Sequence, residues 1–289
     1  MQQRSISAVG VVAAAIVPVL FGGPVWATAI AIFALIGIFE FNRIATTLRL
    51  VPLNVGYVVV VGACLIAAAR WPADLLILPL GGAVIATAIL ALRHNNAERS
   101  FLALAVDLFG TFWLTIPAVL AITTRQMPGS ITTGWLDSTA SALSLGWQAA
   151  PRGLAWMLMI ITVTWLSDTG AYLVGRSIGK TPMVPAISPK KTREGLAGGV
   201  VAGMAFGLLA NWLFGLDLPF LAAAGVSAIL VVSGVIGDLT ESLIKRQAGV
   251  KDSGTLIPGH GGILDRIDAL LFTWTVGYFL ARFCDRFWA

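Results

Sequence analysis

Charged residues are scarce in this chain. Asp, Glu, Lys and Arg make up 11% of its 289 residues, whereas soluble domains carry about 25%. Hydrophobic residues make up 57%, and the mean hydropathy is +0.87. The composition therefore excludes an ordinary soluble domain and indicates a membrane protein.

Cysteine is scarce too, and common nucleotide-binding motifs are missing. Cys64 and Cys284 lie far apart in apolar stretches, which argues against a disulfide framework or a cysteine metal site and predicts two buried thiols. The sequence has no Walker motif, no GxGxxG and no Ser-His-Asp arrangement. The nucleotide-binding folds of soluble enzymes are therefore excluded.

Long apolar runs recur along the whole chain, and each can cross a hydrocarbon core of roughly 30 Å as a helix. Helices are expected because lipid cannot satisfy free backbone groups, and weak alternation of period two argues against a membrane barrel. We predict an all-α, polytopic integral membrane protein with about nine transmembrane helices. The predicted spans are 7–22, 24–41, 51–69, 73–92, 100–123, 152–175, 195–214, 218–246 and 265–283.

We expect two regions in the chain. Residues 1–150 would hold about five of the helices. Residues 151–289 would form a catalytic transmembrane domain of about four helices, with cytoplasmic active-site loops at 176–194 and 247–264. Residues 124–151, which are rich in Ser, Thr, Gly and Trp, are predicted to form a long loop.

The N-terminus resembles a secretory signal, with Arg4, an apolar run and Ala27 at a plausible cleavage position. Cleavage there would leave only 28–39 of the next apolar run, which is too short to span, so we expect 7–22 to stay as the first helix. A cytoplasmic N-terminus places most of the 19 Lys and Arg residues on the cytoplasmic side, as the positive-inside rule favours. We therefore expect a multi-pass protein of a bacterial-type inner membrane with its active site facing the cytoplasm.

Four glycines recur at a spacing of four in the seventh predicted span: Gly195, Gly199, Gly203 and Gly207. They form a flat stripe on one helix face, where another backbone can approach closely. Tight packing within the chain and dimerisation are both open.

The end of the eighth predicted span carries Asp238, Glu241, Ser242 and Lys245. Their spacing places all four on one face of a helix. An amphipathic helix end with intrahelical pairs is one interpretation. A functional site is the other, because acidic groups this close to a membrane are costly without a partner.

The next stretch, 251–268, is rich in glycine, which rules out a regular helix and frees backbone N–H groups for a ligand. Asp265 and Asp268 then start the last predicted span, where simple helix capping would also favour them. The short connection could bring these carboxylates to Asp238 and Glu241. Oxygen ligands of this kind suit Mg²⁺.

Cations surround these carboxylates, and the pattern is typical of metal-assisted phosphoryl transfer. They are Lys245, Arg246, Lys251, His260 and Arg266. Topology alone explains part of the basic charge.

Two further stretches carry polar groups. Ser188 before Pro189 predicts a helix start with Lys190 and Lys191 in its first turn. Cations there oppose the helix dipole, so they indicate a bound phosphate unless they serve only to orient the chain in the membrane. Asp168, within the sixth predicted span, is a functional candidate that could line a metal site or pair with a lysine for structure.

Glu40 and Asp107 are the acidic residues of two other spans. No second polar group accompanies either one in its own stretch. We therefore expect both to be mainly structural.

The residues from Ser242 onward resemble the phosphatidate cytidylyltransferase (CDP-diacylglycerol synthase) family. The pattern is S-x-x-K-R, then K-D-x-G, then a hydrophobic residue with P-x-H-G-G, then D-R-x-D; the stretches SDTGAY and SPKKTREG also look like family elements. The resemblance covers roughly 160–270. The matching residues are Ser242, Lys245, Arg246, Lys251, Asp252, Gly254, Ile257, Pro258, His260, Gly261, Gly262, Asp265, Arg266 and Asp268.

The resemblance implies the transfer of the cytidylyl group of CTP to phosphatidic acid, giving CDP-diacylglycerol and pyrophosphate. It also implies dependence on Mg²⁺, with one or two metal ions of which the second could be monovalent or divalent, and a homodimer in the lipid bilayer. No nucleic acid is expected as a partner.

The residues are given three sets of roles under this resemblance. Metal ligands would be Asp238, Glu241, Asp265 and Asp268, with Asp168 as a possible addition. Catalysis would use those four with Lys245, Arg246 and Arg266. Substrate phosphates would be bound by Ser188, Lys190, Lys191, Ser242, Lys251, His260, Gly261 and Gly262.

Three other functions are alternatives to this reaction. The CDP-alcohol phosphatidyltransferases use a DGxxAR pattern that is absent here. A CTP-dependent lipid or polyprenol kinase would transfer the γ- rather than the α-phosphorus. An anion transporter would place its site near the membrane midplane, whereas the charges here gather at one predicted face.

Overall fold

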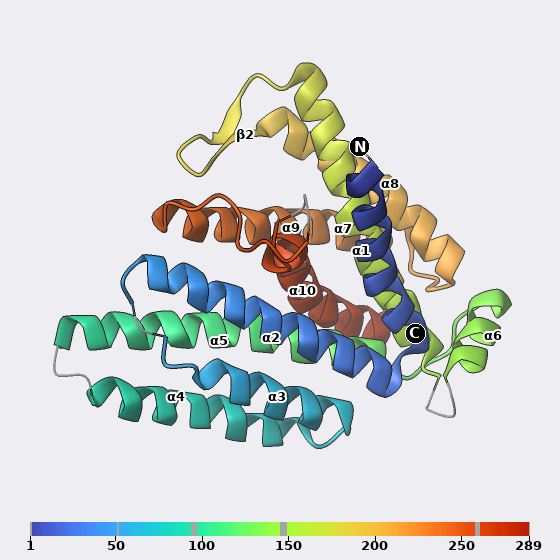
Figure 1. The fold of residues 1–289 in the computed structure, drawn as a ribbon. Helices are drawn as coiled ribbons and strands as arrows, with labels where there is room; N and C mark the ends of the chain where they lie inside the picture. The colour runs from blue at the N-terminus through green and yellow to red at the C-terminus, as the bar shows by residue number, and fades with distance from the viewer. Residues whose placement is uncertain (1, 51, 94–96, 145–148, 258–260, 289) are drawn as a thin grey trace. The chain divides into compact units, whose positions relative to one another are not determined.

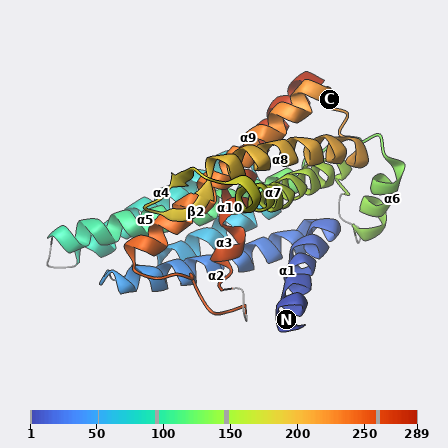
Figure 2. The same ribbon diagram turned by 90° about the horizontal axis from the view of Figure 1, so that it is seen from above.

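The computed structural model describes residues 2–50, 52–93, 97–144, 149–257 and 261–288. The N-terminal elements are α1 (Gln2–Phe21), α2 (Gly23–Thr47), α3 (Val55–Ala68), a 3-10 helix η1 (Ala73–Leu76), α4 (Ile77–Leu92) and α5 (Ala97–Arg125). The later elements are α6 (Gly134–Leu143), α7 (Pro151–Ile178), β1 (Pro182–Val184), β2 (Ser188–Thr192), α8 (Arg193–Phe214), α9 (Phe220–Gln247) and α10 (Leu264–Trp288). Figures 1 and 2 show these elements in two views related by a 90° turn.

The predicted helical membrane class is confirmed. Within the described residues, seven helices are long and apolar enough to cross a membrane. The described apolar parts of α1 and α3 are shorter, at Val12–Phe21 and Val55–Ala68. The chain is therefore a multi-pass membrane protein, while the number of nine spans stays a prediction.

The predicted loop at 124–151 is wrong in its middle, because Gly134–Leu143 forms α6. Leu136 and Ala140 lie one helical turn apart, and both are fully buried. Two apolar residues at this spacing give a short helix one buried face. The Ser- and Thr-rich composition concealed that face.

The chain divides into two compact units. Unit 1 comprises 1–18, 24–123 and 244–267, and unit 2 comprises 19–23, 124–243 and 268–289. The helices α9 and α10 each contribute residues to both units. The boundary that we expect near residue 150 stays a prediction about function.

Within unit 2, the glycine stripe of α8 packs inside the chain. A Cβ on Gly195 would lie 2.9 Å from the carbonyl oxygen of Ala171, and one on Gly207 would lie 2.7 Å from the Cβ of Ser227. Side chains at these positions would separate α8 from α7 and α9, so close packing requires glycine. Of the two interpretations left open, the structure shows packing within the chain.

Candidate active site

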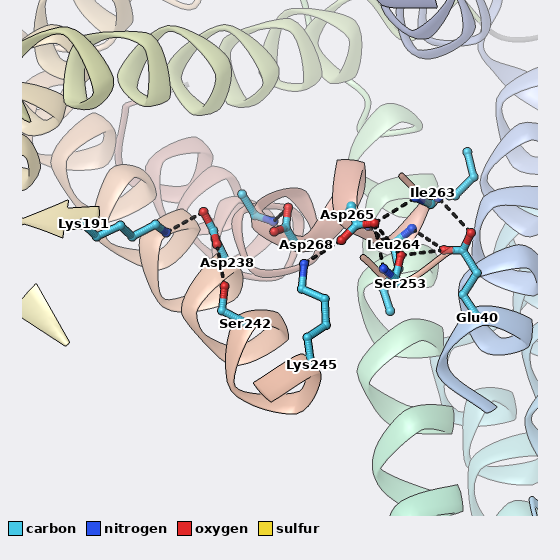
Figure 3. A network of polar contacts seen from close by, with 12 residues as sticks. Glu40, Lys191, Asp238, Ser242, Lys245, Ser253, Ile263, Leu264, Asp265 and Asp268 are labelled. Atoms are coloured by element: carbon cyan, nitrogen blue, oxygen red, sulfur yellow. Dashed lines mark hydrogen bonds and ion pairs between the residues drawn. The ribbon is translucent and has the colours of Figure 1, made fainter. Parts of the chain in front are cut away.

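In unit 1, the segment before α10 is built around the carboxylate of Asp265. It accepts hydrogen bonds from Lys245 Nζ at 2.6 Å, from Gly262 N at 2.8 Å, and from both N and Oγ of Ser253 at 2.9 Å. The Asp265 side chain is 7% exposed and that of Lys245 is 12% exposed (Figure 3). The helix N-terminus and the ammonium group both favour the ionised carboxylate. This Lys–Asp pair is buried and fully bonded.

A second carboxylate, that of Glu40 on α2, lies on the same helix N-terminus. It accepts hydrogen bonds from Leu264 N at 2.8 Å, and from Ile263 N and Ser253 Oγ at 3.1 Å each (Figure 3). Sequence reasoning gave Glu40 no polar partner, because these partners lie more than two hundred residues further along the chain. Its isolation in an apolar helix was nevertheless a sign that a partner exists.

Glycines of the motif make room for these carboxylates. A Cβ on Gly261 would lie 2.5 Å from Asp265 Oδ2, and Gly261 has a positive φ of 80°. A Cβ on Gly262 would overlap Glu40 and the Ser253 hydroxyl. The space beside both residues therefore holds protein carboxylates. Of the other predicted phosphate-binding positions, His260 lies outside the described residues, as do Pro258 and Gly259.

The exposed cations of the motif belong to unit 1. Arg246, Lys251 and Arg266 all have exposed side chains. Their predicted contacts with phosphate stay predictions.

In unit 2, α9 carries Asp238 into a different environment. Its carboxylate pairs with Lys191 Nζ at 2.5 Å and accepts a hydrogen bond from Ser242 Oγ at 3.3 Å (Figure 3). The side chain of Lys191 is 26% exposed and that of Asp238 is 35% exposed. This Lys–Asp pair is therefore open to solvent and to a ligand.

Two other predicted acidic residues lie in unit 2. Glu241 is buried, with 1% of its surface exposed. Asp268, one turn further along α10 than Asp265, accepts a hydrogen bond from Ala269 N at 2.8 Å. A Cβ on Gly237 would lie 2.5 Å from Asp268 O, so α9 and α10 approach closely here.

A cavity of about 690 Å³ opens beside the Lys191–Asp238 pair. Ligand pockets commonly have volumes of about 300–1,000 Å³. The three polar stretches at 167–172, 188–195 and 237–246 all reach this cavity. Its polar lining residues include Asp168, Asp238, Ser188, Lys190, Lys191 and Thr192.

The antiparallel strands β1 and β2 form a hairpin (Figure 1). Lys190 and Lys191 belong to β2. The predicted helix start at Ser188 is wrong: Ser188–Thr192 is a strand, and α8 begins at Arg193. The Oγ1 of Thr192 accepts a hydrogen bond from Gly195 N at 3.0 Å and so caps the helix. Capping at Thr192 leaves Ser188 free to pair with Val184 of β1.

The base of this hairpin is tied to the first turn of α8 by Glu194. Its carboxylate accepts hydrogen bonds from Thr181 Oγ1 at 2.8 Å, Thr181 N at 3.1 Å and Lys180 N at 3.2 Å. Arg193 N also donates to Thr181 O at 2.9 Å. Sequence reasoning did not single out Glu194, although an acid in a first helical turn is a familiar stabilising choice.

The residues around the cavity fit a hard cation such as Mg²⁺ in chemistry. Asp168 and Asp238 both line it and offer the oxygen ligands that Mg²⁺ prefers. Among the described residues, no three His, Cys, Asp or Glu side chains are grouped closely enough to form a complete metal site. Asp265 fits a metal less well, since four donors already occupy its oxygens.

Over residues 2–284 the chain matches the model of the Cytidylyltransferase family. The chain belongs to this family. A phosphatidate cytidylyltransferase of Bacillus subtilis (strain 168) is 44% identical over 128 residues, which cover 44% of this chain and 48% of the relative. One of Staphylococcus aureus (strain COL) is 43% identical over 126 residues, with the same coverage.

A third relative, the uncharacterized protein YnbB of Escherichia coli (strain K12), is 38% identical over 205 residues. These cover 64% of this chain and 68% of the relative. The chain thus spans about half the length of the phosphatidate cytidylyltransferases that it matches, and a larger part of YnbB.

Proposed function

We propose that this cytidylyltransferase uses CTP and phosphatidic acid to make CDP-diacylglycerol and pyrophosphate. One observation carries the proposal: Asp168, Lys190, Lys191 and Asp238 come from three separate stretches and line one cavity. Clustered carboxylates and lysines suit a reaction between two phosphate anions. The names of the similar proteins support phosphatidate as the acceptor.

In this reaction a phosphate oxygen of phosphatidate attacks the α-phosphorus of CTP. A new P–O bond forms while the bond from that phosphorus to the β-phosphate oxygen breaks, and pyrophosphate leaves. The acceptor needs no strong base, because a phosphomonoester with a second pKa of about 6 is already ionised at neutral pH. The chain's residues therefore have to bind, orient and screen charge.

Lys190 and Lys191 would bind phosphate oxygens from the hairpin, and Ser188 would add a hydroxyl donor. Lys191 would exchange Asp238 for substrate phosphate, which its partial exposure permits. Released in this way, Asp238 would join Asp168 in holding a Mg²⁺ ion, with Glu241 and Asp268 of the same unit as the further predicted ligands. The ion would supply positive charge against the triphosphate.

The same proposal includes the cellular setting. The N-terminus and the active site would face the cytoplasm of a bacterial-type inner membrane, as the distribution of Lys and Arg favours. A homodimer would form through surfaces other than the glycine stripe of α8, since that stripe packs within the chain.

The test gives purified protein CTP labelled at the α-phosphorus, Mg²⁺ and phosphatidate. We expect label in CDP-diacylglycerol and release of unlabelled pyrophosphate. Label in CDP, with a new lipid phosphate from the γ-position, would support a lipid kinase instead. The absence of any chemistry would leave transport as the better hypothesis.

The site is tested with Asp238→Asn against Asp217→Asn. Asp217 is an exposed residue of unit 2 with a φ of 54°, a conformation that Asn tolerates well. We expect Asp238→Asn to lose activity by about 100-fold and Asp217→Asn to keep it. Equal activity in the two variants would refute the role of Asp238.

A further inference from the structure

Glu40 lies in the half of the chain that has no motif, yet its carboxylate contacts residues of the motif. In unit 1 the described part of the motif after α9 comprises 251–257 and 261–267 and is called the motif segment here. The residue is 3% exposed. Its Oε1 accepts from Ile263 N, and its Oε2 accepts from Leu264 N and Ser253 Oγ. A buried carboxylate is tolerated when donors of this kind satisfy it.

The fit between Glu40 and the segment is mutual. A Cβ on Gly254 would lie 2.9 Å from Glu40 Cδ, and one on Gly262 would lie 2.5 Å from Glu40 Oε1. Each glycine thus leaves the space that the carboxylate fills. A larger side chain at Gly254 or Gly262 would displace either the backbone of the segment or the Glu40 carboxylate.

Ser253 joins Glu40 to the charged pair beside it. Its hydroxyl oxygen lies 3.1 Å from Glu40 Oε2 and 2.9 Å from Asp265 Oδ2, and Asp265 in turn holds Lys245. The two carboxylates therefore share one hydroxyl and one helix N-terminus (Figure 3). A shift of Glu40 would move the backbone on which Asp265 is mounted.

We infer that Glu40 is a positioning residue: through Ser253 and the first turn of α10 it holds Asp265 and Lys245, the predicted catalytic residues of unit 1. The inference rests on the proposed function for the reaction that it assists. It adds to the site a residue from α2, far from every motif in the sequence.

The charge and both oxygens of Glu40 are required. Glutamine keeps the length of the side chain but has only one acceptor oxygen. Its NH₂ group would face the backbone N–H of either Ile263 or Leu264, and that N–H would lose its acceptor whichever way the amide is turned. The start of α10 would have to shift, and a shift of about 1 Å at a catalytic group can cost about 100-fold in rate.

The experiment compares Glu40→Gln with Asp107→Asn. Asp107 is also a buried carboxylate of unit 1, and it accepts from Leu53 N at 3.1 Å and from Thr87 Oγ1 at 3.4 Å. It touches no residue of the motif segment in these bonds. Both variants are measured for thermal unfolding in detergent, for kcat, and for the KM values of CTP and phosphatidate.

We expect Glu40→Gln to lower kcat by about 100-fold with small changes in both KM values, and Asp107→Asn to keep kcat even where its unfolding temperature falls. We also expect the amide hydrogens of Ile263 and Leu264 to exchange at least about 10-fold faster in Glu40→Gln. Equal kcat values in the two variants, or unchanged amide exchange, would overturn the inference.

A double-mutant cycle provides a second measurement. Gly254→Ala alone should lower kcat because its methyl group would overlap Glu40, whose side chain supplies the three atoms nearest to that position. Added to Glu40→Ala, which vacates that space, the same substitution should cause little further loss. Additive losses would refute the mutual fit.

These outcomes separate the inference from the proposed function. Wild-type protein that forms no CDP-diacylglycerol would refute the proposed reaction and, with it, the role of Glu40 in that reaction. If the wild-type protein forms CDP-diacylglycerol and Glu40→Gln has the same kcat as the wild type, the inference is refuted and the proposed reaction is not.

Discussion

Two lysine–aspartate pairs in this protein have the same chemistry and different surroundings. Lys245–Asp265 in unit 1 has side chains that are 12% and 7% exposed, and three further hydrogen bonds hold its carboxylate. Lys191–Asp238 in unit 2 has side chains that are 26% and 35% exposed, and it borders a cavity of about 690 Å³.

This difference indicates that the two pairs have different roles, one structural and one in binding. A buried pair with all its oxygens bonded is expensive to separate, so Lys245–Asp265 is suited to hold the motif segment in one shape. A partly exposed pair contributes little to stability, so Lys191–Asp238 can separate when a phosphate or a cation competes. We infer that unit 1 supplies a fixed framework and unit 2 the exchangeable contacts.

The largest effect is expected from breaking the buried pair. Lys245→Met keeps the length of the side chain but leaves the Asp265 charge buried without its ammonium partner. We expect a loss of about 3–5 kcal/mol in stability, measured as a lower unfolding temperature in detergent, together with a loss of activity. An unfolding temperature equal to that of the wild type would contradict the role of this pair in holding the motif segment.

Breaking the exposed pair should lower activity strongly and stability only slightly. Lys191→Ala removes one predicted phosphate contact and frees Asp238, and we expect about 100-fold lower kcat/KM with a stability change below about 1 kcal/mol. Lys180→Ala, an exposed lysine of the same connection that does not line the cavity, is the matched control. A similar loss of kcat/KM in both variants would mean that Lys191 acts only through the overall positive charge of the surface, and not through a specific phosphate contact.

Much of this comparison was accessible from the sequence. Helical spans follow from apolar runs, and the regular spacing of Asp238, Ser242 and Lys245 on one helix marked a polar face. The structure brings the stretches 167–172, 188–195 and 237–246 to one cavity, while the predicted meeting of Asp238 and Glu241 with Asp265 and Asp268 stays a prediction. Their roles in binding and catalysis stay predictions.

Other features depend on contacts that local patterns do not show. Ser188 and Thr192 can both cap a helix, and only the pairing of β2 with β1 decides for Thr192. The partners of Glu40 lie 213 to 224 residues away. The single acidic residue in an apolar helix showed that a partner was needed, but not which one.

The smallest effect is expected at the base of the hairpin. This prediction tests whether the lysines of β2 depend on the hydrogen bonds of Glu194 for their position beside the cavity. Glu194→Ala removes the acceptor for Lys180 N, Thr181 N and Thr181 Oγ1. The strands would still pair through Pro182–Thr192, so the lysines should stay near the cavity with looser placement.

We therefore expect Glu194→Ala to raise the KM of one substrate by about 10-fold, equivalent to about 1.4 kcal/mol of binding, with kcat within a few-fold of the wild type. Thr181→Val removes one of the three donors and should cause a smaller rise in the same KM. Steady-state kinetics with each substrate varied in turn measures both. A fall in kcat with unchanged KM values would instead mean that the hairpin acts on the reacting groups, and the distinction between a fixed unit 1 and an adaptable unit 2 would then be lost.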